Sequence, residues 1–115
     1  MAGSELFLGR QRLMEEDIIK NIRLIERLKC GILQWTAQLF QAMYNGPERL
    51  ILDVLSNLVL YSYLLGNRVG VSFSRLDQGI NDKVRLYLKE QDNQEHEIPS
   101  EELLLFLRYR ETYRN

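Results

Sequence analysis

The sequence predicts an all-α protein, on three observations. Apolar residues recur at spacings of three, four or seven, the pattern of a helix with one buried face. Only two prolines and seven glycines interrupt 115 residues, which favours long helices. No segment alternates apolar and polar residues as a half-buried strand does. The clearest helical row is formed by Ile18, Ile22, Ile25, Ile32, Leu39 and Met43.

The first helix is expected to run from about Met14 to Tyr44, after a loose lead-in over residues 1–11. A second apolar row beside the first, which includes Leu28 and Trp35, suits a helix that touches two neighbours. Gly31 costs a helix interior about 1 kcal/mol relative to alanine. This position therefore allows a kink or a break near residues 29–31.

The second helix, expected from Pro47 to Leu65, is apolar on nearly every side. Before it, Asn45 and Gly46 predict a tight turn, in which glycine supplies a left-handed ending and proline occupies the first helical position. A short turn makes the two helices antiparallel neighbours. A helix that is apolar all round must be covered on more than one side. We therefore expect the core to be completed by a homodimer, or a dimer of dimers, through residues 47–65.

A third helix is expected to begin after a Ser72 cap, and residues 90–97 read as a polar loop. Pro99 and Ser100 open a last helix, over about residues 100–113, with Glu101 and Glu102 at its positive end. The chain is predicted to form a single domain over residues 1–115, with a core of about residues 14–90.

The bulk composition excludes several classes of protein. A formal charge of −1 gives no global attraction to nucleic acid, and Cys30 and His96 are each the only residue of their type, which argues against thiolate or histidine metal clusters. No signal peptide is apparent, and the uninterrupted apolar run at residues 58–65 is far shorter than the roughly 20 residues of a membrane span. We expect a cytoplasmic protein with no membrane partner.

Asp53 is the most informative charged residue, because it lies in the second turn of the apolar helix, beyond the reach of the helix dipole. A carboxylate among apolar neighbours is costly unless it is paired, hydrogen-bonded or bound to a cation. Two interpretations remain open: a residual metal or ligand site, or a carboxylate that is hydrogen-bonded to a glutamine, a tyrosine or a basic residue of the bundle.

Three segments of the chain carry a recognisable order of residues. They are Gln34, Trp35 and Gln38, then Leu50, Asp53, Val54 and Leu55, then Asn81, Lys83 and Arg85. With these residues, the chain from about residue 22 to residue 85 resembles the MazG-like, all-α nucleoside triphosphate pyrophosphohydrolase group. That group carries Glu-Glu-x-x-Glu on one helix, Glu-x-x-Asp-Val-Leu on the next, then a glycine-bearing turn and a helix with Lys, Asn and Arg. The likeness is strongest to short MazG-like proteins of Gram-positive bacteria, whose sites have similarly lost acidic residues.

The resemblance implies the fold and argues against the reaction. Magnesium prefers several carboxylate oxygens around substrate phosphates, and of the acidic positions only Asp53 is kept. We therefore expect a catalytically degenerate protein that acts as a structural, regulatory or ligand-binding module and needs no cofactor. The alternative is an active pyrophosphohydrolase with Mg²⁺ or Mn²⁺ at Asp53. A weaker alternative, a helical nucleic-acid-binding or adaptor protein, rests on the Arg- and Tyr-rich tail over residues 108–114, although we do not expect nucleic acid as a partner.

The remaining candidate site residues each have a functional and a structural interpretation. In the functional interpretation, the ligand is a nucleotide. The amides of Gln34, Gln38 and Asn57 keep the region of the family's metal site polar, and Lys83 and Arg85 bind phosphate. In the structural one, the glutamines are exposed, Asn57 fixes helix register, and the basic residues belong to a solvated face. Trp35 could stack on a base, but a tryptophan in a helix row is more often a core residue.

Overall fold

The computed structural model describes residues 2–90 and 97–113, with side chains from Gly9 onward. Four helices account for most of the described chain: α1 (Ala2–Asn45), α2 (Glu48–Arg68), α3 (Phe73–Glu90) and α4 (Ser100–Tyr113). No strand occurs in these ranges. The all-α prediction is confirmed. The predicted polar loop over residues 90–97 lies largely outside the described residues.

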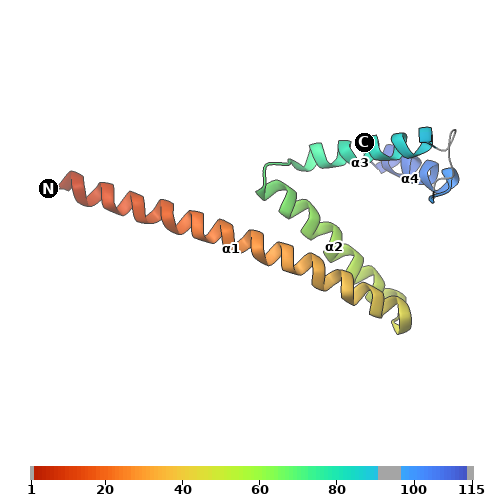
Figure 1. Ribbon diagram of the computed structural model, residues 1–115, viewed down its shortest axis with the longest axis horizontal. Helices are drawn as coiled ribbons and strands as arrows, with labels where there is room; N and C mark the ends of the chain where they lie inside the picture. The colour runs from red at the N-terminus through yellow and green to blue at the C-terminus, as the bar shows by residue number, and fades with distance from the viewer. Residues whose placement is uncertain (1, 91–96, 114–115) are drawn as a thin grey trace. The chain divides into compact units, whose positions relative to one another are not determined.

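The chain divides into two compact units, residues 1–71 and residues 72–115. In the first unit, α1 and α2 form an antiparallel hairpin (Figure 1). In the second, α3 packs against α4. The prediction of a single domain over the whole chain stays a prediction.

α1 begins at Ala2, whereas the sequence suggested a lead-in up to residue 11 and a helix from about Met14. The apolar row that located the helix starts only near Met14, but no proline or glycine pair stops the helix before that point. The row indicates a helix only where its residues stand, so the turns before Met14 were missed.

Gly31 does not break α1, which continues through this position without interruption. A glycine is needed at this position because α2 approaches α1 closely here. A Cβ atom at residue 31 would lie 2.5 Å from Cδ2 of Tyr61, a distance that real Cβ contacts essentially never show. Tyr61 also makes an edge-to-face contact with Trp35, with ring centroids 6.2 Å apart and an interplanar angle of 85°. The expectation that Trp35 is a packing residue agrees with this contact.

The α1–α2 turn is built differently from the prediction. Gly46 does not have a positive φ, and the glycine that does is Gly70, at +96° after α2. At residue 46 a Cβ would instead lie 2.7 Å from the Ala42 carbonyl oxygen, which accepts a hydrogen bond from the Gly46 N–H. Glycine is therefore required here by contact with α1 and not by a left-handed backbone.

The predicted third and fourth helices agree with the structure. The Ser72 hydroxyl accepts a hydrogen bond from the Arg75 N–H at 3.2 Å, the geometry of an N-cap. α4 occupies the predicted residues and has Glu101 and Glu102 in its first turn. These ends are set by residues close in sequence, which explains why they could be predicted.

Most of α2 is uncovered in the single chain. One face packs on α1 through the buried Val54, while Leu52, Leu55 and Val59, at spacings of three and four on another face, are exposed. By length and composition alone, α2 could also cross a membrane: its mean hydropathy reaches 1.4 over 18 residues, of which 6% are buried. A helix at the core of a soluble bundle, covered by its neighbours, has the same apolar composition as a membrane-spanning helix.

Candidate functional site

An open groove lies between the end of α1 and the start of α2, beside their shared turn. Its volume is about 300 Å³. The buried side chains of Ala42 and Val54 form its apolar part. The lining residues are Gln38, Gln41, Ala42, Asn45, Gly46, Leu50 and Val54. Three of the positions singled out by the family resemblance, Gln38, Leu50 and Val54, therefore meet in one groove.

The polar part of the groove consists of amides. Gln38, Gln41 and Asn45 follow one another at spacings of three and four, so they lie along one face of α1. Each amide offers one carbonyl acceptor and two N–H donors but carries no charge. Sequence reasoning missed Gln41 and Asn45, although their helical spacing from Gln38 was a readable signal.

Asp53 does not line this groove. It is solvent-exposed in the single chain, and no hydrogen bond or ion pair joins it to another described residue. In the single chain α1 covers only one face of α2 and leaves Asp53 outside the contact, so the interpretation of Asp53 as a carboxylate among apolar side chains stays a prediction. Gln34 is likewise exposed, and Asn57 is half-buried. Their assigned roles stay predictions.

The donor set does not suit a divalent metal ion. Within residues 2–90 and 97–113, no three His, Cys, Asp or Glu side chains lie together as a metal site requires. Magnesium sites use carboxylates and substrate phosphates as ligands. A groove lined by three amides, three aliphatic residues and a glycine does not provide them.

On α1, Lys29 Nζ donates a hydrogen bond to Glu26 Oε1 at 2.8 Å. That hydrogen bond, together with the negative charge of Glu26, raises the pKa of Lys29 above its usual value. The pair is exposed and does not line the groove, so it is an ordinary surface ion pair.

Lys83 and Arg85 lie on α3, in the second compact unit, and both are exposed. Arg85 lines a small cavity of about 50 Å³ at the α3–α4 contact, together with Asn81, Leu107, Arg110 and Glu111. The Asn81 Oδ1 atom there is buried and lacks a hydrogen-bond partner among the described residues. The cavity is large enough for a water molecule, and Lys83 does not line it.

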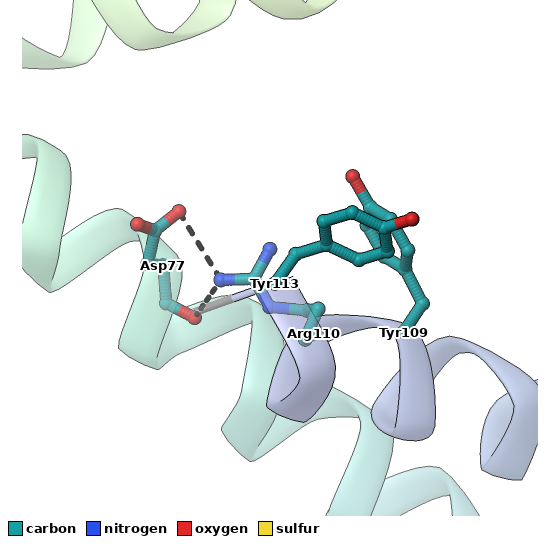
Figure 2. Close-up of a pocket in the computed structure, with 4 residues that line it drawn as sticks. All are labelled: Asp77, Tyr109, Arg110 and Tyr113. Atoms are coloured by element: carbon teal, nitrogen blue, oxygen red, sulfur yellow. Dashed lines mark hydrogen bonds and ion pairs between the residues drawn. The ribbon is translucent and has the colours of Figure 1, made fainter. Parts of the chain in front are cut away.

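Arg110 of the tail connects α4 to α3. Its Nη2 atom donates to the Asp77 carbonyl oxygen at 3.2 Å and lies 3.2 Å from Asp77 Oδ1, as Figure 2 shows. The guanidinium also lies 5.5 Å from the centre of the Phe106 ring. These contacts hold the side chain, of which only 16% is exposed. This arginine is a packing residue of the second unit.

The tail tyrosines lie beside this pair. Tyr109 and Tyr113 have ring centroids 4.9 Å apart, and together with Asp77 and Arg110 they line an open hollow of about 170 Å³ (Figure 2). The basic group of the hollow is engaged by Asp77 and Phe106. The arrangement does not favour nucleic acid binding over a structural role.

The fold and the groove define an all-α protein with a helical hairpin, in which amide and aliphatic side chains stand at most of the positions where the related hydrolases carry acids. A family model described as the MazG-like family matches residues 18–100. The chain therefore belongs to the MazG-like family and is related to nucleoside triphosphate pyrophosphohydrolases. Comparisons with curated proteins and with solved structures gave no significant match. The likeness to short Gram-positive proteins stays a prediction.

Proposed function

We propose that this chain is a non-catalytic member of the MazG-like family, which acts as a homodimeric structural, regulatory or ligand-binding module. The observation that carries the proposal is the donor set of the α1–α2 hairpin. Gln38, Gln41 and Asn45 face the groove as neutral amides, and Asp53 stands apart from it. Hydrolysis of a triphosphate needs metal ions that activate water and neutralise phosphate charge. This donor set does not supply their ligands.

Dimerisation is supported by the uncovered apolar surface. The exposed fractions of Leu52, Leu55 and Val59 are 64%, 43% and 55%. Such a face on a helix of mean hydropathy 1.4 is unfavourable in water. A second copy of the hairpin, packed through residues 47–65 in a dimer or a dimer of dimers, would cover it. The protein would then be soluble and cytoplasmic.

The second candidate is an active, metal-dependent pyrophosphohydrolase. It is favoured by the exposure of Asp53, because acids of a partner subunit could reach this carboxylate in an oligomer. Mg²⁺ or Mn²⁺ would then be required.

Pyrophosphate release separates the two candidates. The full chain is incubated with each common ribo- and deoxyribonucleoside triphosphate in the presence of Mg²⁺ or Mn²⁺. We expect no release above the protein-free background for the wild type, for Asp53→Asn, or for Glu48→Gln, a matched loss of an exposed acid on α2. Turnover by the wild type that is lost in Asp53→Asn and kept in Glu48→Gln would establish the enzyme and overturn the non-catalytic proposal.

A further inference from the structure

α1 carries a seam of residues spaced alternately three and four apart, the register of a coiled coil. It continues through four heptads without a skip. The seam residues are Met14, Ile18, Asn21, Ile25, Leu28, Ile32, Trp35, Leu39 and Ala42. Because the register is unbroken, the seam shifts around a straight helix by only about 20° per heptad.

α2 covers only part of the seam. α1 has 44 residues and α2 has 21, so at 1.5 Å per residue they are about 66 Å and about 32 Å long. The last residue of α2, Arg68, donates from Nη1 to Asn21 Oδ1 at 3.3 Å, which marks the end of the covered part. Between there and the turn, Leu28 and Ala42 are buried.

Beyond Asn21 the same seam is bare. Met14 and Ile18 are 64% and 57% exposed, and the neighbouring Leu13, Ile19 and Ile22 are also exposed. We call residues 9–20 the overhang. Of the seam positions in the overhang, Met14 and Ile18 are apolar as in the covered part, and Gln11 is polar. Only the length of α2 limits the covering.

We infer that the overhang is an interaction surface that pairs with the overhang of a second copy of this chain, side by side and parallel. The inference rests on the proposed homodimer and deepens it. The first argument for a second copy is continuity: the bare seam extends an interface that already uses this register, and it lies on the same hairpin as the exposed face of α2.

The second argument is charge. In this register Arg10 and Glu15 occupy the two positions that flank the seam, five residues apart. In a parallel pair, residues with this spacing face each other across the seam and form interhelical ion pairs that set partner choice and orientation. Two copies would therefore form the Arg10–Glu15 pair twice. The remaining flanking residues, Asp17 and Ile22, bring no like charges together.

The test compares two neighbouring isoleucines in the full chain. Ile18→Glu places a charge in the seam, whereas the matched control Ile19→Glu makes the same change at a position about 100° around the helix. Burial of the Ile18 side chain in each copy favours the dimer, and an unpaired charge at that position opposes it. We therefore expect Ile18→Glu to raise the dissociation constant of the dimer at least about tenfold, as measured by sedimentation equilibrium. Ile19→Glu should leave it within about threefold, and circular dichroism confirms that both variants stay helical.

Cross-linking tests the parallel arrangement. With the exposed Cys30 replaced by serine, Met14→Cys should form an intermolecular disulfide on mild oxidation, and Glu16→Cys, on the opposite side of the helix, should not. If the chain is dimeric but neither Ile18→Glu nor Met14→Cys has these effects, the overhang inference is wrong and the α2-mediated dimer stands. A wild-type chain that is monomeric at all concentrations overturns both. If the wild-type chain is a monomer, its binding to phosphatidylcholine–phosphatidylglycerol vesicles is measured by co-sedimentation. Binding by the wild type that is lost in Ile18→Glu would assign the overhang to a lipid surface instead.

Discussion

Substitution of Gly31 by alanine tests whether the closest approach of α1 and α2 holds the hairpin together. Glycine is a poor residue for a helix interior, and alanine should on propensity alone stabilise α1 by about 1 kcal/mol. The structure predicts the opposite sign. The added Cβ would lie 2.5 Å from Tyr61 Cδ2, so either the ring or the whole of α2 must move.

The size of the effect follows from two destabilising contributions and one stabilising contribution. Overpacking a well-packed contact costs typically about 1–3 kcal/mol. Displacing the Tyr61 ring also weakens its edge-to-face contact with Trp35, and such pairs contribute about 0.5–1.5 kcal/mol beyond area burial. With the propensity gain of about 1 kcal/mol subtracted, we expect a net loss of about 0.5–3.5 kcal/mol in the free energy of unfolding.

Urea unfolding followed by circular dichroism measures this change. Gly79→Ala on α3 is the matched control, because nothing lies within 4 Å of a Cβ built there. This control should gain up to about 1 kcal/mol. In the double variant Gly31→Ala/Tyr61→Ala, the alanine at residue 31 should no longer destabilise relative to Tyr61→Ala alone. If Gly31→Ala stabilises the protein as Gly79→Ala does, the close approach of the two helices is refuted.

Two further predictions concern the second unit and the dimer. Arg110→Met keeps most of the side-chain volume but removes the contacts with Asp77, so we expect thermal unfolding to show a loss of about 1–3 kcal/mol in stability. The control Arg108→Met, on the exposed side of α4, should change stability by less than about 0.5 kcal/mol. Equal effects of the two substitutions would contradict the packing role of Arg110. Val59→Glu, on the exposed face of α2, should convert the dimer to a monomer, as measured by sedimentation equilibrium. If the variant remains a dimer, residues 47–65 do not form the dimer interface.

The sequence alone determined the features that are set over a few residues. Helical periodicity, the Ser72 cap and the acidic first turn of α4 act through neighbours three or four positions away. The same local pattern carried the family resemblance, which the match over residues 18–100 confirms. The start of α1 was placed too late, because the apolar row that indicated the helix begins only near Met14.

Only the tertiary structure decided which faces meet. The role of Gly31 depends on Tyr61, 30 positions away, and reverses what helix propensity suggested. Asp77 and Arg110 are 33 positions apart, so no local sequence pattern predicted their pairing. Whether Asp53 lies among apolar side chains or in water depends on how much of α2 is covered by neighbouring helices. The composition of α2 does not determine that coverage. Residue types fix what a helix is able to bury, but the lengths and approach of its partners fix what it does bury.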